Sequence, residues 1–194
     1  MKQTIDYYSP AEDFLTEYKL HRILFNQGII DETVQHREGD FRLEDGRLIE
    51  VKTDARCFAS VNPTGNIPVE MDHPKHKGRQ GWYHHCIENG VSIVLFCCCD
   101  DEECMHAVRY ISIPMDGLKE FVGAKMQDAD YMREHTRYTK DGTGNLCVPY
   151  QEILTISGTR QLIPLDRIER DGKHITMCPG KHERTALAYD QATI

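Results

Sequence analysis

The stretch Gly39-Asp40-Phe41-Arg42-Leu43-Glu44-Asp45-Gly46-Arg47-Leu48-Ile49-Glu50-Val51-Lys52 predicts a β-hairpin around which the rest of the chain is organised. Asp45-Gly46 is a dipeptide typical of hairpin turns, and credible strand residues flank it. Glu50 and Lys52 are two residues apart, so on a strand they project from the same face. An acidic pair beside a lysine can hold a divalent cation and orient a water molecule.

The register of this hairpin decides whether Asp40 joins Glu50. A two-residue Asp45-Gly46 loop would pair Asp40 with Val51 and turn Asp40 away from Glu50. A three-residue loop from Glu44 to Gly46, with Gly46 in the left-handed conformation, pairs Asp40 with Glu50 instead. The sequence allows both registers, and we predict the second because the proposed chemistry requires it.

The composition is that of an ordinary globular protein. The chain has 194 residues, with 28% charged and 40% hydrophobic, which suits one domain over residues 1–194. It has no apolar run of membrane-spanning length and no signal-peptide pattern at its N-terminus, so we expect a cytoplasmic protein that does not bind membranes.

The net charge of −8 argues against a general nucleic-acid binder, which usually carries a basic surface. It does not exclude a nuclease, because a metal site needs acids and the phosphate contacts can be confined to patches.

The order of predicted elements indicates an α/β or α+β fold built on a single sheet. A helix is expected from about Pro10 to Gln27, with Ser9 as its N-cap. Strands are expected near 30–35, 39–43, 48–53 and 67–71, then a helix over 79–89 that Gly90 ends, and a buried strand over 91–99. Three Ile-Pro or Val-Pro steps, at 113–114, 148–149 and 163–164, predict strand-to-helix junctions with proline at the first helical position.

The candidate catalytic residues are Asp40, Glu50 and Lys52. Carboxylate oxygens are hard ligands that favour Mg²⁺ or Mn²⁺, and Mg²⁺ bound by one or two carboxylates keeps water molecules. Lys52 can hold or deprotonate such a water, or offset charge on a phosphate. The plain alternative is a surface hairpin that happens to carry two acids and a lysine.

These residues resemble the motifs of the PD-(D/E)xK nuclease superfamily, also called restriction-endonuclease-like. Gly39-Asp40 is similar to its first acidic motif, and Glu50-Val51-Lys52 to its second. Thr64-Gly65-Asn66 leading to Glu70 is similar to a group of small bacterial and phage members. The resemblance covers roughly residues 9–120 and implies an αβββαβ core with a mixed central sheet, leaving residues 121–194 as a C-terminal extension packed on that core. It also implies Mg²⁺ and phosphodiester hydrolysis.

Further acids are candidates for the metal site. Val51 is expected to contribute its carbonyl oxygen, and Glu70 its carboxylate from the strand after the hairpin. Glu17 lies on or beside the buried stripe of the first helix, where it is either an edge carboxylate with a basic partner or another acid directed at the metal.

Basic residues near the site are candidates for nucleic-acid contacts. Lys75, Lys77 and Arg79 form the most basic stretch, and Gln80 lies where some members of the superfamily place a glutamine near the site. A second basic patch, with Arg133, His135, Arg137 and Lys140, is a candidate for another wall of a groove.

Zinc is the competing metal. The eight cysteines of the chain include the consecutive Cys97, Cys98 and Cys99, which are typical of small buried thiols in an apolar strand. Cys97, Cys99, Cys104 and His106 are loosely spaced like ligands, with Cys178 and His182 as additions, but structural zinc sites show tighter paired spacing.

The sequence therefore predicts a metal-dependent nuclease whose partner is nucleic acid, DNA rather than RNA, and it is compatible with a homodimer. One alternative is a catalytically inactive protein of the same fold that binds nucleic acid or another partner. The other is a zinc-stabilised binding module.

Overall fold

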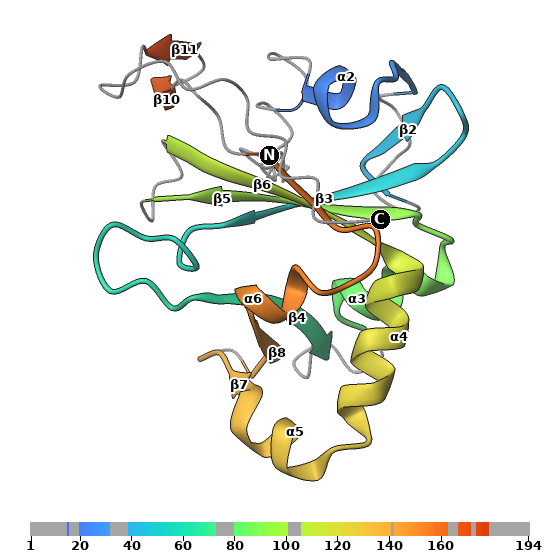
Figure 1. Ribbon diagram of the computed structural model, residues 1–194, viewed down its shortest axis with the longest axis vertical. Helices are drawn as coiled ribbons and strands as arrows, with labels where there is room; N and C mark the ends of the chain where they lie inside the picture. Colours follow the sequence, from blue (N-terminus) through green and yellow to red (C-terminus); the bar gives the residue numbers. More distant parts are fainter. Residues whose placement is uncertain are drawn as a thin grey trace, which may run out of the picture.

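The computed structural model describes residues 15, 20–31, 39–72, 80–100, 106–140, 142–162, 167–171 and 174–178. Figure 1 shows how these parts are arranged. The helices and strands are α2 (Leu20–Phe25), β1 (Ile29–Asp31), β2 (Phe41–Leu43), β3 (Leu48–Asp54), β4 (Asn66–Asp72), α3 (Trp82–Glu88), β5 (Ile93–Cys99), β6 (His106–Pro114), α4 (Met115–Met126), α5 (Ala129–His135), β7 (Thr136–Tyr138), β8 (Gly144–Pro149), α6 (Tyr150–Ile153), β9 (Arg160–Leu162), β10 (Arg167–Asp171) and β11 (His174–Cys178).

The larger sheet has the strand order β1-β2-β3-β5-β6-β10-β11, and β9 also pairs with β6. β3 and β5 run parallel, because α3 carries the chain back between them, and the other described pairs in this sheet are antiparallel. The predicted α/β class with a mixed central sheet is therefore confirmed.

The expectation of a single sheet is wrong. β4 leaves the main sheet and pairs antiparallel with β8, which in turn pairs with β7, so these three strands form a second sheet. The physical reason lies in the back half of the chain, where β8 supplies the buried Leu146 and Val148 opposite Val69 and Ile67 of β4. Local periodicity cannot reveal such a distant partner.

Apolar side chains cover both faces of the main sheet, because residues alternate between faces along each strand. Leu48, Val94 and Phe96 face a cluster that includes residues of α3, α4, α6 and the small sheet. Ile49, Val51 and Leu95 face a second cluster with Leu15 and with Leu24 of α2. In Figure 1, α2 lies on one side of the main sheet, and α3, α4, β4 and β8 lie on the other.

The helix boundaries follow local chemistry. α3 ends at Asn89 and Gly90, and Gly90 adopts the left-handed conformation (φ +68°) that the predicted helix stop requires. Pro114 and Pro149 lie at the starts of α4 and α6 as predicted. Each occupies the N-cap position, however, and not the first helical position that was expected. The third junction, at 163–164, lies outside the described residues.

The back half of the chain is joined to the front half through both sheets. β8 pairs with β4, β9 pairs with β6, and a division at residue 120 falls inside α4. Among the described helices, none is both long and apolar enough to cross a membrane.

Candidate active site

The hairpin adopts the predicted three-residue loop. Phe41 pairs with Ile49, and the Leu43 N–H donates to the Arg47 carbonyl oxygen at 2.9 Å, so Glu44, Asp45 and Gly46 form the turn. Gly46 has φ +87°, in the left-handed region that favours glycine. The two-residue alternative is therefore excluded, and the described pairing ends at Phe41 and Ile49, with Asp40 directly before it.

Backbone contacts hold Asp40 beside the β3 strand. Its N–H donates to the Ile49 carbonyl oxygen at 2.9 Å, and its Oδ2 accepts the Val51 N–H at 2.6 Å. The described β2–β3 pairing ends at Ile49, two residues before Val51. The Asp40 carboxylate therefore accepts the Val51 N–H that a further residue of a paired strand would otherwise accept. The predicted role of the Val51 carbonyl oxygen stays a prediction.

Glu50 and Lys52 form an ion pair on one face of β3. The Glu50 side chain is 9% exposed and the Lys52 side chain 28% exposed, so Lys52 lies nearer the solvent. Burial alone would lower the pKa of Lys52, but Glu50 and, more weakly, Asp40 raise it above its ordinary value. The charges of both predicted catalytic acids therefore act on Lys52.

Cys86 of α3 borders this group and was not anticipated. Burial raises the pKa of the Cys86 thiol, Glu50 and Asp40 raise it further, and Lys52 opposes them. The sequence feature that indicates the burial of Cys86 is its spacing from Tyr83. The two residues are three positions apart and form the buried side of α3. The site thus lies between β3 and a helix that covers it with a small side chain.

The structure does not gather the other predicted acids at this place. Glu70 lies on β4, on the face opposite the buried Val69 and Met71. No three His, Cys, Asp or Glu side chains within the described ranges are close enough together to hold a metal ion. A role for Glu70 therefore stays a prediction, and Glu17 lies outside the described residues.

Most of the residues predicted to contact nucleic acid lie outside the described ranges. This holds for Lys75, Lys77 and Arg79, while Gln80 is exposed and its backbone bridges to Asp72 just before α3.

The zinc candidates divide in a similar way. Cys97 and Cys99 are buried in the apolar cluster on the α2 side of the sheet, and Cys104 and His182 are outside the described residues.

Asp54 shapes the turn that follows β3. Its Oδ1 accepts the N–H groups of Arg56 and Cys57 at 3.1 and 2.6 Å. Burial raises the pKa of this carboxyl group, although both hydrogen bonds and the Arg56 charge oppose the shift. Asp54 is therefore occupied with the turn that follows the strand.

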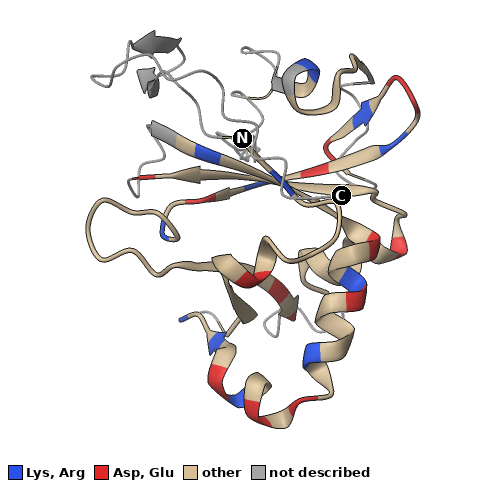
Figure 2. Cartoon of the chain, viewed as in Figure 1, with Lys and Arg blue, Asp and Glu red and all other residues tan. Residues whose placement is uncertain are grey.

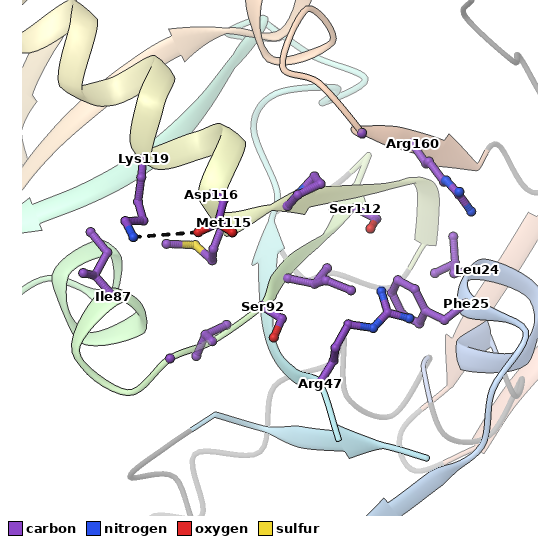
Figure 3. Close-up of a pocket in the computed structure, with 15 residues that line it drawn as sticks. Leu24, Phe25, Arg47, Ile87, Ser92, Ser112, Met115, Asp116, Lys119 and Arg160 are labelled. Atoms are coloured by element: carbon purple, nitrogen blue, oxygen red, sulfur yellow. Dashed lines mark ion pairs between the residues drawn. The ribbon is translucent and has the colours of Figure 1, made fainter. Parts of the chain in front are cut away.

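A cavity of about 720 Å³ lies at the opposite end of β5 from this turn, and it contains none of the three predicted catalytic residues. Figure 3 shows Ser92, Ser112, Arg47 and Arg160 around it. Its one lining carboxylate, Asp116, pairs with Lys119 at 3.8 Å.

Comparison of the sequence with protein-family models gave no match, and a search of curated protein sequences gave no significant match.

Proposed function

We propose that this protein is a metal-dependent nuclease that hydrolyses phosphodiester bonds in nucleic acid, DNA in preference to RNA. The observation that carries the proposal is the hairpin register, which brings the Asp40 carboxylate to the Val51 N–H beside Glu50. Lys52, on the same face as Glu50, completes a set of two carboxylates and one ammonium group.

The donor set suits Mg²⁺ or Mn²⁺. Both side chains offer hard carboxylate oxygens, and Mg²⁺ is commonly held by one or two carboxylates together with waters, so the pair Asp40 and Glu50 is sufficient. When bound, such a cation lowers the pKa of a coordinated water and offsets negative charge on the phosphate.

The protein's own groups supply position and charge. The Val51 N–H holds the Asp40 carboxylate in place, and burial restricts the Glu50 side chain. The Lys52 ammonium group lies at the more exposed side of the pair, where it orients a water or stabilises the charge that develops on the phosphate oxygens.

Membership of the PD-(D/E)xK superfamily is part of this proposal. In its favour, the chain order α2, β1, β2, β3, β4, α3, β5 contains the helix, hairpin, strand, helix, strand sequence of that core, with the short strand β1 as an addition before the hairpin. The second sheet formed by β4, β8 and β7 is a departure from a single central sheet.

The test is cleavage of mixed single- and double-stranded DNA and RNA with Mg²⁺ or Mn²⁺, and with a chelator as control. We expect Asp40→Asn, Glu50→Gln and Lys52→Met each to lower the rate by a factor on the order of 100 or more. Glu88→Gln is the matched control, because Glu88 is an exposed carboxylate on α3. A Lys52→Met variant that cuts at the parent rate would overturn the assignment.

A second candidate is a protein of the same fold that binds nucleic acid or another partner without catalysis. The observation in its favour is that, over the described residues, no group of three metal-binding side chains accompanies the acid pair. Binding of nucleic acid by the parent protein without metal-dependent cleavage of any substrate would support this candidate.

A further inference from the structure

A basic cleft of about 940 Å³ begins where the active-site strand ends. One side is the turn after β3, with Asp54 and Arg56, and the other is the small sheet, with residues of β4, β7 and β8. Asp54 is two residues beyond Lys52 on the same face of β3, a separation of about 6.6 Å at the usual rise of a strand. The cleft is therefore next to the candidate active site.

The charge of the cleft is opposite to that of the chain. Among the residues that the structure describes, Arg56, Arg137 and Lys140 line it together with one carboxylate, Asp54, whereas the whole chain carries a net charge of −8. Asp54 is directed into its own turn, where it accepts two backbone N–H groups. In Figure 2, basic positions lie on β7 and on the turn after β3.

Two of these cations are available to a ligand. Arg137 and Lys140 are exposed, and within the part of the chain that the structure describes neither forms an ion pair. Arg133, which the sequence grouped with them, does not line the cleft and pairs with Asp130 at 2.9 Å. The structure therefore separates the members of the predicted basic patch.

An aromatic ring stands beside the cations. Tyr138 of β7 lines the cleft and is 73% exposed. Its ring lies over Gly144 of β8, where an added Cβ would come within 3.3 Å of it. The ring is thus supported on the sheet and open on its outer side, as a stacking platform for a base needs to be.

We propose that this cleft binds single-stranded nucleic acid, with phosphates at Arg137 and Lys140 and a base stacked on Tyr138. Cations alone would suit a duplex, but a tyrosine face can stack only on a base that is not already stacked and paired. The binding itself does not depend on the proposed nuclease function. Only the further step, in which the bound strand continues to Glu50 and is cut there, rests on that function.

The test measures fluorescence anisotropy of a labelled mixed-sequence DNA strand of about 12 nucleotides, within the site sizes usual for such grooves. The Glu50→Gln background is used so that cleavage does not interfere. We expect the double variant Arg137→Glu, Lys140→Glu and the single variant Tyr138→Ala each to weaken binding about tenfold or more, and Tyr138→Phe to bind like the background protein. Arg133→Glu, the matched control, should change the affinity less than twofold.

The salt dependence gives an independent measure. For a single strand, each phosphate that the protein no longer neutralises reduces the slope of log affinity against log salt by about 0.7, so the double variant should show a slope smaller by about 1.4. Equal affinity for a duplex of the same sequence, equal competition by a polyglutamate peptide, or an equal effect of Arg133→Glu would each overturn the cleft assignment.

The two proposals fail separately. If the strand binds through the cleft but the parent protein cuts nothing with any metal, the nuclease proposal falls and the cleft stands. If the parent cuts while the cleft variants bind normally, the cleft assignment falls and the nuclease proposal stands.

Discussion

At the scale of single residues, Glu50 is a buried carboxylate whose charge is offset by one neighbour. Breaking a fully buried ion pair costs about 3–5 kcal/mol, because the remaining charge is left without compensation. Since the Lys52 side chain keeps 28% exposure, we expect Lys52→Met to lower the free energy of unfolding by about 2 kcal/mol.

Glu50→Gln is the comparison for this prediction, because the longer and more exposed Lys52 can turn toward water when its partner is gone. Urea unfolding of both variants, followed by circular dichroism, measures the difference. An equal loss in the two variants would show that packing, and not the uncompensated charge, determines the effect.

Asp54 gives a pH-dependent prediction. Burial raises the pKa of its carboxyl group above the ordinary 3.8 in the folded protein, so the folded state binds more protons than the unfolded state between the two values. The parent protein should therefore lose stability as the pH rises from about 3.8 through the raised value. Asp54→Asn removes this titration while keeping an oxygen that can accept the N–H groups of Arg56 and Cys57.

The measurement is the free energy of unfolding of Asp54→Asn minus that of the parent, followed from pH 3 upward in steps of about half a unit. The difference should increase with pH across this window and stay constant above it. Asp54→Ala leaves both N–H groups without their acceptor and should lower stability by about 1–3 kcal/mol. A flat difference for the Asn variant would contradict the raised pKa.

At the scale of elements, the hairpin register determines whether Asp40 reaches the site. Deleting Arg42 from β2 would leave the three-residue loop unchanged but move every residue before Arg42 by one position along the strand. Because a shift of one residue turns side chains to the other face, Asp40 would leave Glu50 while Glu50 and Lys52 stay together. We expect the deletion to abolish cleavage with a near-native far-ultraviolet spectrum.

Gly46→Asn is the control for the hairpin, because asparagine tolerates the left-handed conformation of Gly46 and preserves the loop length. It should keep most of the activity. If the deletion variant cuts as well as Gly46→Asn, the position of Asp40 is not what the reaction depends on.

The hairpin and β4 show what sequence can and cannot predict. Asp45-Gly46 with alternating strands is local chemistry, and with the requirement that Asp40 meet Glu50 it led to the register that the structure has. The alternation of Ile67, Val69 and Met71 predicted a strand, but it is equally compatible with any sheet. Its pairing with β8, the burial of Cys86 beside the site and the basic cleft all depend on contacts between distant segments.

At the scale of the whole molecule, the central strands β3, β5 and β6 are shared by two apolar clusters, one on each face of the main sheet. The first cluster also contains the small sheet, through Ile67, Val69, Leu146 and Val148. Neither cluster can lose its central strands while the other stays packed. We therefore expect the described parts of the chain to unfold as one cooperative unit.

The cysteines report on this cooperativity, because they are distributed over both clusters. Cys57, Cys86 and Cys98 belong to the first cluster, and Cys97 and Cys99 belong to the second. Burial raises the pKa of the Cys57 thiol to about 12 and also raises those of Cys86 and Cys98. Since the thiolate is the reactive form, these groups should resist alkylation at neutral pH until the protein unfolds.

Labelling with iodoacetamide at increasing urea, read by mass spectrometry of the peptides, tests this prediction. Cysteines of both clusters should become reactive at the same urea concentration, which should also be the midpoint of the circular dichroism transition. Cys147 is only half-buried on the cleft side of the small sheet, so it should react earlier and serves as the internal control. Separate midpoints for Cys86 and Cys97 would mean that the two faces of the sheet unfold independently, since only a shared set of strands links their exposure.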